Sequence, residues 1–145
     1  GETTSELVSR VSEEFERRFR ENRTVVIVQH AHNDFWEGEG RVPDIGKTLK
    51  NFGKIFDILS KVPLLCISPV WMPSHTKGDR TYRTDLLEKF VKELQALSNE
   101  LNIPFINVFS ILKGKSSYYT STWHLNSKGN KLVTELVRKR LLQYL

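Results

Sequence analysis

Apolar residues recur at helical spacing in four segments of the chain. In the first segment, three or four positions separate Val8, Val11 and Phe15, with Glu and Arg between them, which is typical of an amphipathic helix. The same spacing recurs in the other three segments, and Asn126 or Ser127 is a suitable N-cap for the last one. The pattern therefore predicts four helices whose apolar positions span residues 8–19, 45–59, 87–101 and 132–141, with the last helix beginning near residue 127.

Three short apolar runs lie between these helices: TVVIVQ at 24–29, PLLCIS at 63–68 and PFINVF at 104–109. Their hydrophobicity is continuous rather than alternating, as in strands that are buried on both faces of a parallel sheet. The order helix–strand–helix–strand–helix–strand–helix predicts an α/β architecture with right-handed crossovers. We expect one domain over residues 1–145, with 69–81 as the longest irregular stretch after a strand.

Polar side chains follow each predicted strand. The segment HAHND, residues 30–34, comes directly after the first strand, and Ser68, Trp71 and His75 follow the second. His124 lies beyond the third strand, just before the last helix. Ligands of such sheets bind beyond the carboxyl ends of the strands, so we expect these segments to meet at one edge.

Composition bears on whether the chain crosses a membrane, carries a signal peptide or contains a reactive cysteine. No apolar run approaches the ~20 residues that span a bilayer, and nothing at the start resembles a signal peptide. The single cysteine, Cys66, lies in an apolar run and is expected to be a buried, inert thiol. The chain begins with Gly1 rather than Met, as in a processed protein or a piece of a longer one.

The formal net charge is +5, and part of the excess lies on the last predicted helix. A solvated helix face accounts for this charge, and a surface for nucleic acid or anionic lipid is the alternative. The basic residues concerned are Lys128, Lys131, Arg138, Lys139 and Arg140.

Three segments together resemble the conserved blocks of the SGNH (GDSL-type) hydrolases, which are flavodoxin-like α/β esterases and lipases. AHND at 31–34 is similar to the third block, Gly-x-Asn-Asp, and departs from it only at the first position. STWHLNSKG at 121–129 resembles the fifth block, Asp-x-x-His-Leu-Asn-x-x-Gly, except at its first residue. GETTSEL at 1–7 resembles the second block. The resemblance therefore covers essentially the whole chain and implies a three-layer α/β/α sandwich.

The resemblance implies a role for each matching residue. His124 is the general base that deprotonates a serine. Gly1 and Asn33 are donors of the oxyanion hole, each typically worth ~3 kcal/mol of barrier. Asp34 is expected to hold loops together through hydrogen bonds, with catalysis as the lesser alternative. Ser121 occupies the place of the carboxylate that orients the base.

Two departures from the family pattern bear on activity. The first block, with the nucleophile in Gly-Asp-Ser, is absent; Ser68 is the best stand-in, and turn hydrogen bonding is its alternative role. At Ser121 a hydroxyl can hold an imidazole in one tautomer but cannot stabilise the imidazolium, and loss of that carboxylate costs about 10⁴ in rate in a related triad.

The missing block also removes N-terminal strand structure that would flank residues 24–29 in the family. This segment would then be an edge strand with no charge or proline to protect it. We therefore expect the edge to be covered, either by a second copy of the chain in a homodimer or by a separate segment that carries the missing block.

Other rim residues have two interpretations each. His30 and His32, with Asp34 or His124, have the chemistry of a zinc site, but the resemblance explains the Asn-Asp pair without metal, and we expect no metal or other cofactor. Three tryptophans either line a cleft for an acyl or sugar group or fill gaps above the sheet. They are Trp36, Trp71 and Trp123. His32 is a further candidate for the lining of this pocket. His75 is expected at the surface.

Three functions remain open at this point. The first is an acyl-ester hydrolase core that acts on an ester of a lipid, an acetylated sugar or a small alcohol by serine acyl transfer. The second is a non-catalytic SGNH-like module for binding or assembly, favoured by the missing nucleophile and by Ser121 and Ala31 in place of Asp and Gly. The third is an esterase-like domain of a nucleic-acid-associated protein of the retroelement type. Such a domain would bind nucleic acid with an affinity that falls steeply as the salt concentration rises.

Overall fold

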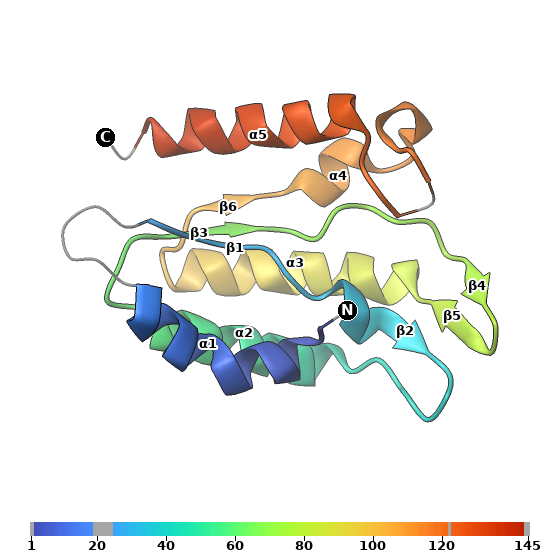
Figure 1. Ribbon diagram of the computed structural model, residues 1–145, viewed down its shortest axis with the longest axis horizontal. Helices are drawn as coiled ribbons and strands as arrows, with labels where there is room; N and C mark the ends of the chain where they lie inside the picture. The colour runs from blue at the N-terminus through green and yellow to red at the C-terminus, as the bar shows by residue number, and fades with distance from the viewer. Residues whose placement is uncertain (1, 19–24, 122, 144–145) are drawn as a thin grey trace.

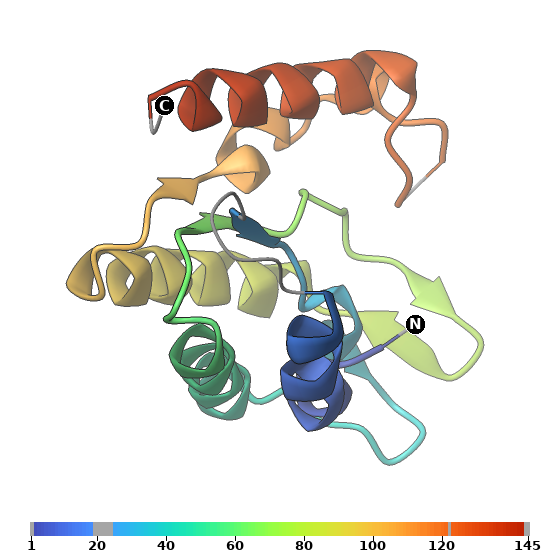
Figure 2. The same cartoon turned by 60° about the vertical axis from the view of Figure 1, so that its left-hand side comes forward.

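The computed structural model describes residues 2–18, 25–121 and 123–143. A parallel sheet is covered by helices on both faces: α1, α2 and α3 lie on one side, and α4 and α5 on the other (Figure 1). Figure 2 shows the same separation after rotation. The helices are α1 (Thr4–Arg18), α2 (Ile45–Ile58), α3 (Thr84–Glu100), α4 (Val108–Leu112) and α5 (Ser127–Leu141), with 3₁₀ turns η1 (His32–Phe35) and η2 (Ser116–Tyr118). This arrangement confirms the three-layer α/β/α class.

The parallel sheet has the strand order β1-β3-β6. Strand β1 spans Val26–Val28, β3 spans Leu64–Ile67 and β6 spans Phe105–Ile106. Residue 26 pairs with residue 64, and residue 66 pairs with residue 105. In the described part of the chain β3 is therefore central, and β1 has a neighbour on one side only.

The central strand divides the core into two parts. Leu64 and Cys66 belong to the cluster beneath α1–α3, whereas Leu65 and Ile67 belong to the cluster beneath α5. All four side chains are buried, because successive residues of a strand point to opposite faces and both faces are covered. Burial raises the pKa of the Cys66 thiol to about 12, as expected for an inert cysteine.

Two of the sequence predictions need correction. Residues 69–81 are not wholly irregular, since β4 (Thr76–Lys77) and β5 (Arg80–Tyr82) form a second, antiparallel sheet with β2 (Trp36–Glu37). The strand predicted at 104–109 ends early, because the Asn107 side chain accepts a hydrogen bond from the Ser110 amide at 3.0 Å and starts α4.

The long helices were predicted correctly in position. Helix α1 begins at Thr4, before the predicted start, and the predicted end at Phe19 lies outside the described residues. Asn126 is the N-cap of α5, as one of the two alternatives predicted. Within the described ranges, no helix combines the length and the hydropathy needed to cross a membrane.

Candidate active site

The turn that carries His124 is fixed by the residues on either side of it. The Asn126 side chain donates to the Ser117 carbonyl at 2.9 Å and accepts from the Gly129 amide at 3.0 Å. Gly129 is required here, because a Cβ would lie 2.5 Å from the Tyr118 carbonyl oxygen. The turn therefore holds the exposed imidazole of His124 at the N-terminus of α5.

Ser121 is the hydrogen-bonding partner of this imidazole. Its hydroxyl lies 3.2 Å from His124 Nδ1, the nitrogen that an orienting residue contacts in hydrolytic triads. No described residue forms a hydrogen bond with the other ring nitrogen, Nε2. The geometry thus leaves Nε2 available to a nucleophile or to solvent.

A strained turn follows β1. Ala31 has a φ of 100°, a conformation that favours glycine, and it stands where the family block has glycine. The next residues form η1, in which the Asp34 amide donates to the Ala31 carbonyl at 3.0 Å. Within this turn the Asn33 side chain donates to the Glu2 carbonyl at 3.0 Å. An amide carries two N–H donors, so one of them is still available.

Asp34 joins this turn to the start of α1. Its carboxylate accepts hydrogen bonds from the Thr4 amide at 2.9 Å and from the Thr4 hydroxyl at 2.5 Å. Thr4 is fully buried, and its hydroxyl also accepts from the Asn51 side chain at 3.1 Å. The carboxylate therefore satisfies buried donors that no water reaches.

We expect Asp34→Ala to lower the free energy of unfolding by about 3 kcal/mol, because two charge-assisted hydrogen bonds are lost and buried donors stay unpaired. Urea unfolding followed by circular dichroism measures this loss. Asp44→Ala is the matched control: Asp44 caps α2 by accepting from the Lys47 amide at 2.9 Å, and loss of an exposed cap costs about 1 kcal/mol. Equal losses in the two variants would contradict the prediction.

His32 lies in the same turn but faces a different neighbour. Its Nδ1 is 2.8 Å from the hydroxyl of Tyr82, which is fully buried in β5. Burial, followed by the nearby His30, lowers the pKa of His32 to about 4. Burial also raises the pKa of Tyr82 above its ordinary value, with Asp34 as a second cause. Both groups are therefore neutral near pH 7.

The lowered pKa predicts a loss of stability in acid. In the unfolded protein the pKa of His32 returns to about 6.5, whereas in the folded protein the ring binds a proton only near pH 4. The free energy of unfolding should therefore fall by about 3 kcal/mol in total as the pH drops from about 6.5 to about 4, and above that range His32 should not change it. Urea midpoints between pH 7 and 4 test this, since His32→Asn should flatten the curve. Parallel curves for the two proteins would refute the assignment.

A cluster of rings joins the two segments. The His75 ring lies 5.0 Å from Trp36, which follows η1, and 4.7 Å from Trp123, which precedes His124. It also stacks on Tyr82 at 5.6 Å. His75 is therefore half-buried, and its predicted surface position is wrong. The cluster places the turns of Asn33 and His124 at the same end of the sheet (Figure 1).

Sequence reasoning missed Tyr82, and it placed His75 at the surface rather than in this ring cluster. His75 Nδ1 lies 2.8 Å from the Pro73 carbonyl; a carbonyl only accepts, so Nδ1 carries the proton. Nε2 is buried with no partner among the residues described. The sequence TKGDRT contains a usable signal, because a Gly-Asp pair between short polar runs is typical of a two-residue hairpin loop.

The remaining candidates have other surroundings. Trp71 lines a hollow of about 300 Å³ together with Tyr119 and Ser121, and the Tyr119 hydroxyl donates to the Trp71 carbonyl at 2.6 Å. Ser68 is fully buried. Its hydroxyl donates to the Pro69 carbonyl and accepts from the Phe109 amide, which fits the turn role rather than a nucleophile.

The remaining candidates are Gly1 and His30. Gly1 lies outside the described residues. His30 Nε2 is 3.4 Å from the Glu2 carboxylate. Over the described ranges, no group of three or more His, Cys, Asp or Glu side chains is placed to hold a metal ion.

Solved structures of known proteins are similar to this fold. The lipase/acylhydrolase from Enterococcus faecalis is similar in structure, with a TM-score of 0.78 and 17% identity over 97% of this chain and 70% of that one. A GDSL-like lipase from Bacteroides thetaiotaomicron has a TM-score of 0.80 and 15% identity over 99% and 73% of the two chains. An acetyl xylan esterase has a TM-score of 0.76 and 16% identity over 96% and 76%. No curated protein matched the sequence.

A parallel sheet between helical layers, with an Asn-Asp pair and a histidine at its carboxyl edge, is the arrangement of an SGNH-type hydrolase core. The sequence profile of the GDSL-like lipase/acylhydrolase family matches residues 1–132. The chain belongs to this family.

Proposed function

We propose that the chain is the core of a carboxylic-ester hydrolase whose serine nucleophile is brought by a segment that pairs with β1. The substrate is an acyl ester of a lipid or an acetylated sugar. The contact between the Ser121 hydroxyl and His124 Nδ1, at 3.2 Å, carries the proposal. It orients an exposed imidazole whose Nε2 can take a proton from an incoming hydroxyl.

The oxyanion hole is the second part of the proposal. Asn33 lies in the turn after β1, and one N–H of its amide is used by the Glu2 carbonyl. The other N–H can donate to the oxygen of a tetrahedral intermediate. The same hydrogen bond holds Glu2 beside Asn33. Gly1, which lies outside the described residues, is proposed as a further donor because of the resemblance of residues 1–7 to the second block of the family.

The exposed edge of β1 supports the proposal of a pairing segment. Ile27 of β1 and the preceding Val25 are 43% and 37% exposed, and proteins seldom leave an apolar edge strand uncovered. Between α1 and β1 lies an open hollow of about 440 Å³, lined by Arg10, Val11 and Val26 among others. A strand added here would cover both features, and a second copy of the chain is the alternative occupant.

The experiment compares two forms of the protein: residues 1–145 alone, and the same chain expressed with whatever sequence precedes residue 1 in its gene. Each form is assayed for turnover of p-nitrophenyl acetate and acetylated xylan, since one structural neighbour is an acetyl xylan esterase. Each is then labelled with a fluorophosphonate. We expect turnover and labelling only in the longer form, at a serine outside residues 1–145.

Two results would overturn the proposal. Labelling of a serine within residues 1–145 would show that the nucleophile lies elsewhere than proposed. Absence of turnover and labelling in both forms would favour the second candidate, a non-catalytic binding or assembly module. That candidate draws support from Ser121 in place of a carboxylate and from Ala31 at a φ of 100°.

Oligomeric state separates the two proposed occupants of the β1 edge. Light scattering after size-exclusion chromatography should give a monomer for the longer form. A dimer of that form would favour pairing between copies.

A further inference from the structure

Positive charge is concentrated in the part of the chain that carries His124. Residues 101–145 contain seven Lys and Arg residues and one acidic residue, Glu135, which gives them a net charge of +6. Residues 1–100 contain fifteen basic and sixteen acidic residues, which gives them a net charge of −1. The positive part includes α4, η2 and α5, the helical layer on one face of the sheet (Figure 1). The layer that holds the proposed base is therefore the positively charged one.

Two exposed lysines stand next to the turn of His124 itself. Lys77, at the end of β4, has its Nζ 5.8 Å from the centre of the Trp123 ring, and that ring lies 6.3 Å from the His124 ring. Lys128, in the first turn of α5, has its Nζ 4.8 Å from the centre of the Tyr118 ring. An aromatic face attracts an ammonium group but carries no net charge of its own. Both lysines therefore keep a full positive charge close to the base.

Carboxylates of the neighbouring segments do not cancel these two charges, because most of them already have a partner. Glu37 pairs with Arg83 at 2.8 Å and Glu39 pairs with Arg80 at 3.5 Å. Neither of the two lysines forms an ion pair with a described residue. Asp79, in the loop between β4 and β5, is the acid left without such a pair in residues 36–41 and 76–82. It can offset at most one of the two lysines.

The start of α5 adds to the same positive field. The first N–H groups of a helix carry partial positive charge, which acidic residues commonly offset. The first turns of α1 and α3 contain Glu6 and Asp85, whereas the first turn of α5 contains no acidic residue and its N-cap, Asn126, is neutral. Among the described residues, the side chains in contact with the His124 ring are a hydroxyl and an indole, and neither is a carboxylate.

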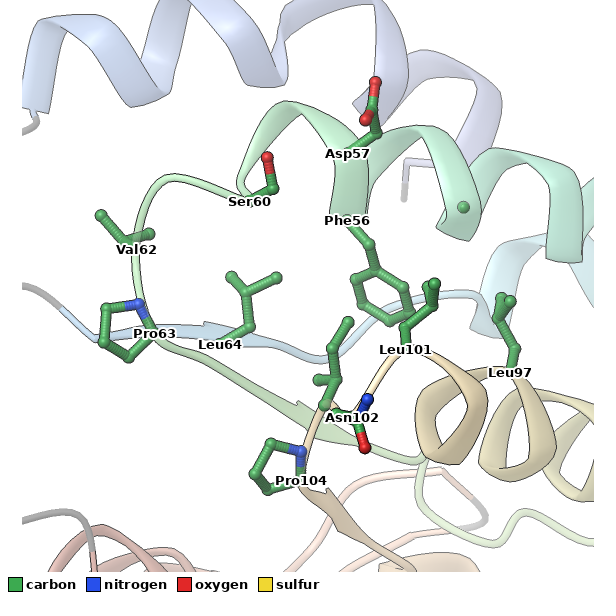
Figure 3. Close-up of a pocket in the computed structure, with 12 residues that line it drawn as sticks. Phe56, Asp57, Ser60, Val62, Pro63, Leu64, Leu97, Leu101, Asn102 and Pro104 are labelled. Atoms are coloured by element: carbon green, nitrogen blue, oxygen red, sulfur yellow. The ribbon is translucent and has the colours of Figure 1, made fainter.

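A larger hollow at the other end of the sheet lacks this character. It has a volume of about 650 Å³ and opens between the C-terminal ends of α2 and α3 (Figure 3). Phe56, Leu64 and Leu101 form its apolar walls, and the Asp57 carboxylate points away from them. The charge that can select a ligand therefore lies at the His124 end of the molecule.

We propose that the site selects esters that carry a negative charge, a carboxylate or a phosphate, on their acyl or alcohol part. The inference rests on the proposed function, because it names the substrate class of that same site. Lys77 and Lys128 are the specificity-determining residues: they attract the anion and hold the ester beside His124. A positively charged surface also raises the local concentration of an anionic substrate, and salt weakens this effect.

Turnover of paired esters by the form that includes the sequence before residue 1 tests the selection. p-Nitrophenyl hemisuccinate and p-nitrophenyl butyrate differ by a charge on the acyl part, and 3-acetoxybenzoate and 3-acetoxybenzamide differ by a charge on the alcohol part. Lys77→Gln and Lys128→Gln should each lower kcat/KM for the charged ester of one pair about three- to fivefold, as expected for an exposed ion pair. The neutral ester should stay within twofold of the parent. The pair that responds identifies which part of the substrate carries the charge.

Lys50→Gln is the matched control, because Lys50 is an exposed lysine of α2, in the opposite layer. It should leave both members of each pair unchanged. The preference for the charged ester should also fall at high salt in the parent. A ratio of charged to neutral kcat/KM that is the same in the parent and in both lysine variants would overturn the proposal.

Binding of uncleaved analogues separates this proposal from ester hydrolysis. N-(4-nitrophenyl)succinamate and 4-nitrobutyranilide are the amide counterparts of the first pair, and residues 1–145 alone are titrated with each while the NMR signals of the His124 ring are followed. The anionic anilide should bind at least fivefold more tightly, and the double variant of Lys77 and Lys128 should lose this difference. If it binds so while no ester is turned over, the hydrolytic function fails and the anion selectivity stands. Equal binding of the two anilides, no binding, or binding that leaves the His124 signals unmoved would refute the selectivity even in an active esterase.

Discussion

Replacement of His124 by alanine is expected to lower kcat for p-nitrophenyl acetate by about 10²-fold in the form of the protein that carries the nucleophile. Loss of the base from an intact triad costs about 10⁶ in rate, but the absence of the orienting carboxylate already costs about 10⁴ of it, so about 10² remains for His124 to supply. The imidazole is exposed, and its side-chain contacts among the described residues are with Ser121 and the Trp123 ring. The substitution should therefore leave the thermal midpoint unchanged.

His75→Ala is the matched control for this experiment. His75 contacts Trp36 and Trp123 but lies on a different element from the proposed base. We expect it to change KM and the thermal midpoint through loss of ring packing, with kcat within tenfold of the parent. If both variants lost kcat equally, the base would not be identified. If His124→Ala kept more than about a tenth of the parent kcat, the proposed role would be wrong.

Periodicity predicted the layers of this fold because the long elements each bury one continuous surface. Helices α2 and α3 were found within a few residues of their predicted limits, since each presents apolar side chains at steps of three and four to the sheet. The run LLCI became a central strand because both of its faces are covered. In these elements the apolar pattern that is visible in the sequence is also the surface whose burial stabilises the fold.

The small antiparallel sheet was missed for a physical reason. Strands β2 and β4 have two residues each and β5 has three, too few for a period of two to emerge. Their stability comes from tertiary contacts, such as the ring contact of Trp36 with Tyr82 at 5.3 Å. The hairpin of β4 and β5 has a local signal in TKGDRT, but its pairing with the distant β2 has none.

The candidate site was predictable only where a motif encodes its own geometry. In residues 124–129 the roles of Asn126 and Gly129 follow from local contacts with η2, so the motif places His124 by itself. The partners of His32 and Asp34 lie 50 and 30 positions away in sequence. Resemblance to a family locates such residues, but the contacts that fix them come only from the fold.

Residue 121 is expected to have a large effect on the rate of ester hydrolysis. We expect Ser121→Asp to raise kcat/KM for ester hydrolysis by up to ~10⁴ in the nucleophile-bearing form, because a carboxylate next to His124 Nδ1 stabilises the imidazolium that forms in the transition state. The hydroxyl now at 3.2 Å from Nδ1 orients the ring without supplying charge. Residue 121 is exposed, so the added charge carries little desolvation cost.

Two matched variants separate charge from orientation. Ser121→Asn has the shape of aspartate without its charge and should gain less than tenfold, whereas Ser121→Ala should lose about tenfold because the ring is no longer held. The pH–rate profile gives an independent readout: the rising limb of kcat/KM should move to higher pH in Ser121→Asp alone, since the carboxylate favours the protonated ring. If Ser121→Asp and Ser121→Asn were equally fast, the electrostatic argument would fail. If neither exceeded the parent, the missing carboxylate would not limit this site.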